Sequence, residues 1–300
     1  MVDVDVMHWN CRGFYSKYEQ VELLQQKYNP KIVCLQETYH TANKPVGMRN
    51  YAAYNTPPPQ QPARAKGCAA ILISKNVPHT HIAINTNLQA LAVRATLHRV
   101  VTICNLYLPP SQNIDYDDLR NLVNQLPSPF LLVGDLNAHS PIWGNKNTDQ
   151  KGKFVEKLLD DFNLCIFNDK TPTYFHFPTG SRTSIDLTIG SPNLVLDYKW
   201  QVCNDLYESD HYPVILQPVR PVPEPKLKRF VYQKADWEEF QKRCHLLSSD
   251  QYTVEDPITK FTSDISSIMS DTIPQTSVVT NTKVLKPWFN RSRKPTQKSP

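Results

Sequence analysis

The chain has 300 residues, of which 40 % are hydrophobic and 20 % charged, and its formal net charge is +5. This composition is typical of a globular protein, and the length suffices for one large domain with an appendage. No apolar run approaches the roughly 18–20 residues of a membrane-spanning helix, so we expect no membrane partner.

Seven cysteines occur singly along the chain. Their odd number and lack of clustering predict reduced thiols and argue against a disulfide framework or a zinc site. The first ten residues lack the basic start and apolar stretch of a secretory signal. We therefore expect a protein that is not secreted and that works in the cytoplasm or nucleus.

The first predicted strand lies at the N-terminus, where Val2, Val4 and Val6 alternate with polar residues. A helix is predicted next, from Tyr18 to Tyr28, and Pro30 ends it. A hairpin turn is expected at His98–Arg99. Further strand-like runs lie at 31–37, 67–74, 91–110, 129–137, 164–167, 185–189 and 212–217.

Two more helices are predicted in the first 220 residues. Asp115 is placed to cap the first, and residues 151–162 carry the apolar stripe of the second. Strand-like runs outnumber helices and several follow one another directly. The pattern therefore predicts a mixed α/β domain built in layers.

We place a domain boundary near residue 220, giving domains 1–220 and 221–300. The stretch 217–226 contains four prolines and is typical of a linker. Helical spacing after it, with Asp236 as a cap, predicts a short helical appendage. The last twenty residues hold six basic groups and no acid, and this tail could contact phosphate or simply be solvated.

Polar side chains stand where the predicted strands end. Asp135 and Asn137 follow the buried run Leu131–Val133, and their spacing by two directs both to one side. The other positions of this kind are Asn10, Glu37, Asn105, Tyr107, Asp186, Asp210 and His211.

Carboxylate and amide oxygens are the ligands that Mg²⁺ selects. Acidic residues alone would repel a phosphodiester, whereas a divalent cation among them reverses the field and can stabilise a departing alkoxide. The adjacent pair Asp210–His211 suggests an imidazolium or a general acid/base. Together these residues predict a metal-dependent phosphoesterase site.

Each residue also has a simpler interpretation when taken alone. Glu37 at a strand end could be a solvated or capping side chain, and Asn10 a turn residue. Asp135 to Asn137 could form an Asx turn. Asp186 could cap a loop, and Tyr107 could belong to the core. Only the ordered set favours a common function.

The ordered motifs WN, QE, NLYLPP, GDLN, SID and SDH resemble those of the endonuclease/exonuclease/phosphatase superfamily. The stretches HWNCRG, GDLNAHSPIWG and SRTSIDLTI are similar to the endonuclease domain of jockey-type non-LTR retrotransposons. The resemblance covers residues 1–217. Beyond it, ADWEEF, TIPQTS and KPWFN resemble the segment that leads to a reverse transcriptase.

The resemblance implies a DNase I-like α/β fold. It is a four-layer sandwich in which two mixed β-sheets pack face to face and are flanked by helices. It also implies an Mg²⁺-dependent endonuclease, with Mn²⁺ able to substitute, that nicks double-stranded DNA. The nick would leave a 3′-hydroxyl to prime reverse transcription by a C-terminal reverse transcriptase, so the site of action would be the nucleus.

The resemblance assigns roles residue by residue. Glu37 would be the principal metal ligand, with Asn10 and Asp210 completing the site. The catalytic residues would be Asp135 for the attacking water, Asn137 and His211 for the scissile phosphate, Asp186 to orient His211, and Tyr107 near the leaving group.

Further DNA contacts are expected from Arg182, Lys66 and Asn105. Two alternatives stay open. One is an abasic-site repair endonuclease or another phosphoesterase of the same fold. The other is a catalytically inactive DNA-binding remnant of a mobile element.

Overall fold

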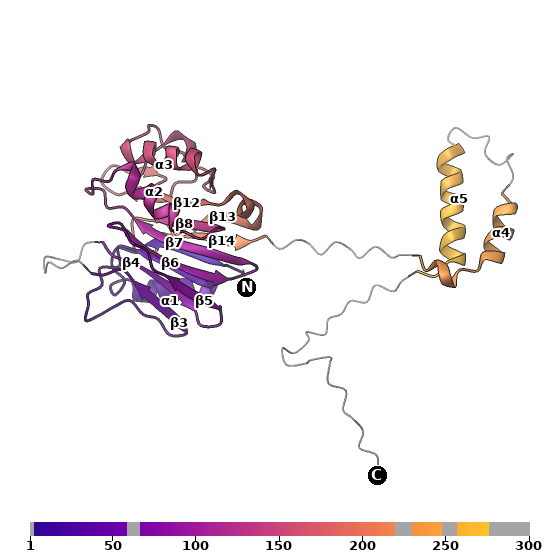
Figure 1. Cartoon of the computed structure of the whole chain (residues 1–300), viewed down its shortest axis with the longest axis horizontal. Helices are drawn as coiled ribbons and strands as arrows, with labels where there is room; N and C mark the ends of the chain where they lie inside the picture. The colour runs from indigo at the N-terminus through magenta and orange to yellow at the C-terminus, as the bar shows by residue number, and fades with distance from the viewer. Residues whose placement is uncertain (1–2, 59–66, 220–229, 248–256, 276–300) are drawn as a thin grey trace, which may run out of the picture. The chain divides into compact units, whose positions relative to one another are not determined.

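The computed structural model of the chain describes residues 3–58, 67–219, 230–247 and 257–275. The backbone divides into two compact units, residues 1–220 and residues 221–300. Below, these are called the first and second unit. Each has its own set of elements (Figure 1).

The first sheet of the first unit has six strands in the order β13-β14-β1-β2-β4-β3. Strands β1 and β2 run parallel, and every other neighbouring pair is antiparallel. The strands are β1 (Val6–Asn10), β2 (Ile32–Gln36), β3 (Tyr51–Asn55), β4 (Ala69–Ser74), β13 (Tyr198–Val202) and β14 (Val214–Pro218).

The second sheet also has six strands, in the order β5-β6-β7-β8-β12-β9, with β7 and β8 parallel. The strands are β5 (His79–Ile82), β6 (Gln89–Thr96), β7 (Val100–Tyr107), β8 (Phe130–Asp135), β9 (Cys165–Ile166) and β12 (Asp186–Gly190). Residues 97–99 join β6 to β7, which confirms the hairpin expected at His98–Arg99. A separate hairpin pairs β10 (Tyr174–His176) with β11 (Ser181–Thr183).

The alternation of side chains along each strand creates the layers. On β8, Leu131 and Val133 pack between the two sheets, whereas Leu132 faces the helices on the outer side. On β1, Val6 belongs to the layer between the sheets and Met7 to the opposite outer layer. The chain therefore builds three apolar layers, one between the sheets and one on each outer face.

Helix α1 (Tyr18–Tyr28) covers the outer face of the first sheet, and α2 (Tyr116–Asn124) and α3 (Gln150–Asp161) cover that of the second (Figure 1). Asp115 caps α2 in a capping box with Asp118, as its place before the apolar stripe predicted. Short 3₁₀ turns lie at Pro141–Trp143 and Pro192–Asp197. The predicted four-layer α/β sandwich is confirmed.

Gly134 brings β8 unusually close to the end of β7. Its φ is +141°, and a Cβ atom there would lie 2.0 Å from the carbonyl oxygen of Leu106. Only glycine can adopt this conformation at this separation without moving the backbone. The glycine therefore lets β8 deliver Asp135 close beside the end of β7.

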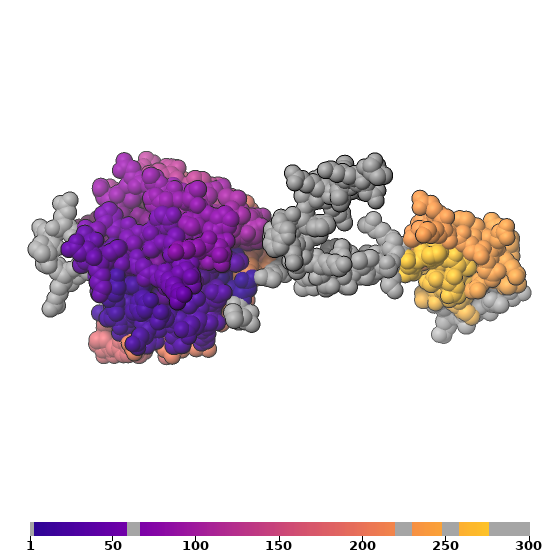
Figure 2. Space-filling view, turned by 90° about the horizontal axis from the view of Figure 1, so that it is seen from below, coloured from indigo at the N-terminus to yellow at the C-terminus, as the bar shows by residue number. Residues whose placement is uncertain are grey.

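The second unit contains α4 (Trp237–His245) and α5 (Pro257–Thr272), preceded by a 3₁₀ turn at Tyr232–Lys234. Asp236 caps α4 by accepting from the amide of Glu239, and Arg243 forms an ion pair with Asp271 of α5 at 3.0 Å. The orange and yellow side chains of the two helices lie against each other in Figure 2.

None of the described helices combines the length and apolar character needed to span a bilayer. Residues 220–226 of the linker, together with the basic tail, lie outside the described residues.

Candidate active site

Strand periodicity brings three polar side chains to one end of the space between the sheets. Asn10 has the same parity on β1 as Val6, and Asp135 the same parity on β8 as Val133. Asp186 on β12 is the direct cross-strand partner of Asp135. The side chains that fill the core along most of each strand are therefore replaced by polar groups where the strands end.

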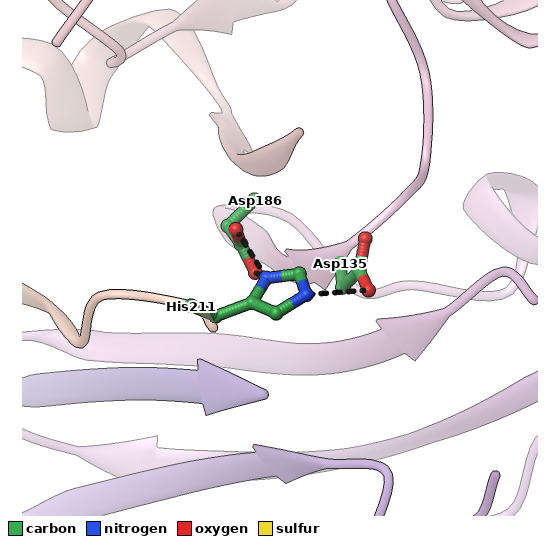
Figure 3. A group of neighbouring side chains, drawn as sticks. All are labelled: Asp135, Asp186 and His211. Atoms are coloured by element: carbon green, nitrogen blue, oxygen red, sulfur yellow. Dashed lines mark hydrogen bonds and ion pairs between the residues drawn. The ribbon is translucent and has the colours of Figure 1, made fainter. Parts of the chain in front are cut away.

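His211 lies between two buried carboxylates, one at each ring nitrogen (Figure 3). Its Nδ1 is 2.8 Å from Asp186 Oδ2, and its Nε2 is 3.9 Å from Asp135 Oδ2. The indole of Trp9 donates to the carbonyl of His211 at 2.9 Å. Side chain and backbone of His211 are thus both held in place.

The charge of His211 follows from these neighbours. Burial lowers the pKa of His211, but the carboxylates of Asp186 and Asp135 outweigh it and raise the pKa to about 9. The ring is therefore an imidazolium at neutral pH, with one N–H directed to Asp186 and the other toward Asp135.

Asn10 links the two sheets of the site. Its Nδ2 donates to Asp135 Oδ2 at 2.8 Å and to Glu37 Oε1 at 3.0 Å. Both partners are acceptors, so the amide must present its nitrogen to them. Its oxygen accepts from the backbone amide of Arg12 at 3.2 Å. In this geometry Asn10 orients the two carboxylates, and its metal ligation stays a prediction.

Among the carboxylates of the site, Asp135 has a clearly raised pKa. Burial raises its pKa, and the negative charges of Asp186 and Glu37 raise it further. His211 and Asn10 lower the pKa, but by less, so it lies at about 7. A carboxylate whose pKa lies near neutrality suits a proton acceptor.

Glu37 follows β2 in the left-handed backbone region, with φ of +48°. A non-glycine residue in this region is uncommon and is typical of functional loops. Its Oε1 accepts from the hydroxyl of Tyr107 at 2.8 Å, and its Oε2 accepts from Tyr39. The carboxylate is partly exposed and turned toward the solvent-accessible end of the sandwich.

Asn137 also has a left-handed backbone, with φ of +45°. Its amide N–H donates to Asp135 Oδ1 at 3.0 Å, which is the Asx turn considered above as the simpler interpretation. The turn and a functional role are compatible, because the turn leaves Asp135 Oδ2 free to face His211 and Asn10. The Asn137 side chain donates to the Leu108 carbonyl at 3.1 Å and borders the cleft.

These residues line one open cleft with a volume of about 230 Å³. Its walls are formed by Arg12, Glu37, Pro110, Asp135, Asn137, His139, Tyr174, Thr183, Ile185, Asp210 and His211. Tyr107 and Asp186 stand immediately behind Glu37 and His211 respectively. The structure thus gathers five predicted site residues at the cleft wall and two more directly behind it.

Comparison with known proteins agrees with this site. Residues 101–215 match the model of a family described as endonuclease-reverse transcriptase. The chain is 25 % identical over 248 residues to the RNA-directed DNA polymerase from mobile element jockey of Drosophila melanogaster. Both matches agree with the resemblance of the sequence motifs to the endonuclease/exonuclease/phosphatase superfamily.

Two of the similar sequences come from mobile elements of one fly. The jockey match covers 80 % of this chain and 26 % of the relative. A probable RNA-directed DNA polymerase from transposon X-element of the same fly is 25 % identical over 250 residues, which is 81 % of this chain and 27 % of the relative. The chain thus spans about a quarter of the length of these relatives.

Solved structures share the fold. The endonuclease domain of TRAS1, a telomere-specific non-LTR retrotransposon, superimposes with a TM-score of 0.60 and 21 % identity over 71 % of this chain and 96 % of that domain. An AP endonuclease from Leishmania major gives 0.57 and 13 % identity over 72 % and 87 %. Both show the DNase I-like sandwich of the superfamily.

The donor set fits a divalent cation on the open side of the cleft. Glu37, Asp135 and Asp210 supply hard carboxylate oxygens to one cavity. Asp135, Asp186 and His211 also lie within ligand distance of one another. However, His211 Nδ1 bonds Asp186, and its positive charge opposes a second cation there. Glu37 and Asp210 therefore stay the predicted ligands, although Arg12 bonds one oxygen of Asp210 at 2.7 Å.

Sequence analysis missed several groups in this cleft. Arg12 donates to Asp210 Oδ2 at 2.7 Å, and its charge holds a carboxylate that the sequence placed at the metal. Tyr39 bonds Glu37, and the Tyr174 ring lies 4.8 Å from that of His211. His139 also borders the cleft. Proximity to the motifs was the one signal for Arg12 and Tyr39.

Three expected DNA contacts have different outcomes. Asn105 is wholly buried between the sheets, where its amide bonds the carbonyls of Leu35 and Ala70, so its predicted substrate contact is wrong. Arg182 is exposed on β11, 5.7 Å from the Phe175 ring, and does not line the cleft. Lys66 lies outside the described residues.

Proposed function

We propose that the first unit is a metal-dependent endonuclease that hydrolyses phosphodiester bonds of double-stranded DNA. The observation that carries this proposal is the buried His211, held by Asp186 and facing Asp135 in an open cleft that Glu37 and Asp210 also line. The match of residues 101–215 to an endonuclease-reverse transcriptase family supports it.

The residues divide the reaction between them. Asp135 takes a proton from the attacking water, because its carboxylate lines the cleft beside His211 and burial raises its pKa. His211 offers the positive charge of its Nε2–H to the phosphoryl oxygens, where negative charge grows in the transition state. Asn137 adds the second N–H of its side-chain amide, since the first is bonded to the Leu108 carbonyl.

Glu37 and Asp210 would hold Mg²⁺, and Mn²⁺ can take the same oxygen ligands. Bound there, the ion would supply positive charge to the scissile phosphate and the departing oxygen. Tyr107 and Asn10 fix the direction of the Glu37 carboxylate through bonds of 2.8 and 3.0 Å to one oxygen.

In the overall reaction, the water oxygen forms a bond to phosphorus, the bond from phosphorus to the 3′ oxygen breaks, and that oxygen takes up a proton from solvent. The products are a 5′-phosphate and a 3′-hydroxyl. Relatives of this chain are RNA-directed DNA polymerases, so we place the reaction in the nucleus, where the 3′-hydroxyl would prime a reverse transcriptase in a longer element.

The proposal is tested with the full chain and supercoiled plasmid. With Mg²⁺ or Mn²⁺ we expect open circles whose nicks carry 3′-hydroxyls that a polymerase extends directly. Excess chelator should stop the reaction. Retarded DNA mobility without nicking under any divalent metal would instead favour a DNA-binding remnant of a mobile element.

The fold similarity to an AP endonuclease raises one alternative substrate, a duplex with an abasic site. Two duplexes of one sequence, intact and with a single abasic site, separate the two activities. Comparable rates support target nicking. A preference of several hundredfold for the lesion would identify a repair enzyme.

A further inference from the structure

A second histidine–aspartate pair lies beside the site and has no part in the function proposed above. His139 Nδ1 is 2.9 Å from Asp149 Oδ2, and the His139 backbone amide donates to Asp149 Oδ1 at 3.1 Å. The Asp149 amide in turn donates to the His139 carbonyl at 3.2 Å. Residues ten apart are thus joined by three bonds.

The N-terminus of α3 holds this pair rigid. Asp149 is the N-cap of α3, and its Oδ1 accepts from the Gly152 amide at 2.7 Å. A Cβ atom at Gly152 would lie 1.9 Å from the His139 carbonyl oxygen, so the helix packs directly on the histidine backbone. The imidazole therefore has a fixed orientation, with Nδ1 facing Asp149.

This pair stands where two cavities meet. His139 lines the active cleft and also an adjoining groove of about 380 Å³, which runs between residues 110–114 and the start of α3. Asn137 and Pro110 border both cavities as well. A DNA strand whose scissile phosphate occupies the cleft would continue along this groove.

The chemistry of the groove suits a phosphate. Asp149 is the acidic residue among the described residues that line the groove. Its two oxygens are already bonded, one to the His139 ring and the other to the Gly152 amide. Lys151 adds a positive charge, and its Nζ donates to the Pro109 carbonyl at 2.6 Å, which holds the segment on the opposite side of the groove. No described residue bonds His139 Nε2, and the His139 side chain is 38 % exposed.

We propose that His139, oriented by Asp149, donates an Nε2–H in its imidazolium form to the backbone phosphate next to the scissile one and so positions the DNA strand along the groove. The arrangement parallels His211, which also directs Nδ1 to an aspartate and leaves Nε2 toward the substrate side. The inference rests on the proposed endonuclease function. Phosphate contacts of this kind fix register and orientation on DNA.

The first test compares His139→Ala with His81→Ala, a surface histidine of β5 outside the cleft. DNA binding is measured in chelator at several salt concentrations, and nicking separately with Mg²⁺. We expect His139→Ala to weaken binding about tenfold and to reduce the salt slope by about one phosphate contact. His81→Ala should match the wild type in both.

The second test locates the contact on DNA. A duplex with a mapped nick receives one uncharged methylphosphonate at each position within two nucleotides of the nick. At one position the substitution should slow the wild type about tenfold and leave His139→Ala unaffected. Additive losses at all positions would overturn the inference. Asp149→Asn, which preserves the helix cap, should lose part of the same effect.

The two proposals can fail separately. If the wild type does not nick DNA at all, the endonuclease function fails. If the wild type nicks but His139→Ala has the wild-type salt slope, only the phosphate contact fails. His139→Gln, which keeps a polar side chain, guards against misfolding: a normal melting temperature with weakened binding supports the contact, and unchanged binding contradicts it.

Discussion

His211 Nδ1 lies 2.8 Å from Asp186 Oδ2, and both side chains are almost completely buried at the cleft. An imidazole paired in this way has a fixed tautomer when neutral and a stabilised charge when protonated. The pair therefore determines whether His211 Nε2 carries a proton that it can donate to a substrate.

Replacement of Asp186 by Asn tests this relationship. The raised pKa of His211 depends on the Asp186 carboxylate, so its loss should move the pKa downward from about 9. We expect kcat for nicking to fall about 10²–10⁴-fold with little change in KM. Asp160→Asn on the exposed side of α3 is the matched control. A wild-type kcat in Asp186→Asn would contradict the assigned role.

Replacement of Glu37 by Gln tests the metal site. Glutamine keeps the oxygen that Asn10 and Tyr107 bond, but removes the negative charge. The Mg²⁺ concentration for half-maximal nicking should rise about 100-fold, and calorimetry should show matching weaker Mn²⁺ binding. Glu19→Gln, exposed on α1, should leave both values unchanged. Equal metal affinity in Glu37→Gln would remove Glu37 from the site.

Gly134→Ala tests the close approach of β8 to β7. The added methyl group meets the Leu106 carbonyl in a backbone conformation that disfavours alanine. Urea unfolding should report a loss of about 3–5 kcal/mol in the free energy of unfolding. Gly47→Ala, where a Cβ atom meets nothing within 4 Å, is the control and should change the free energy by less than about 0.5 kcal/mol. Equal stability of the two variants would refute the argument.

The buried His8 predicts a pH dependence of stability. Burial lowers its pKa from 6.5 to about 4, against the raising effect of Asp186, so between these values the unfolded chain binds a proton that the folded chain does not. Stability should therefore fall with decreasing pH, by about 2–3 kcal/mol between pH 7 and 4.5 from this residue. In urea unfolding at pH 7 and pH 4.5, the free energy of unfolding of His8→Leu should fall by about 2–3 kcal/mol less than that of the wild type. Parallel pH profiles would show that His8 does not contribute.

Much of this architecture follows from local patterns in the sequence. The apolar run Leu131–Val133, ended by Gly134, predicted where Asp135 would emerge, and the structure places it there. The cap at Asp115 and the turn at His98–Arg99 are confirmed for the same reason, because each depends on neighbouring residues. The mixed, layered α/β class also followed from the pattern of runs, whereas the four-layer sandwich came from the family resemblance.

Other features depend on contacts between distant segments. The place of β1 between β2 and β14 joins residues more than 200 positions apart, and no local pattern encodes it. Asn105 ends a strand-like run much as Asp135 does, yet it fills the space between the sheets, because burial at a strand end depends on the facing sheet. The partner of His139 lies across a loop, in the cap of α3.

The central claim is tested most directly by the rate at which Asp135→Asn nicks supercoiled plasmid with Mg²⁺, relative to the wild type. Asparagine keeps the size of the side chain and removes the proton acceptor. We expect the wild type to produce open circles and Asp135→Asn to do so at least about 100-fold more slowly, with an unchanged melting temperature. Nicking by Asp135→Asn at the wild-type rate would contradict the account.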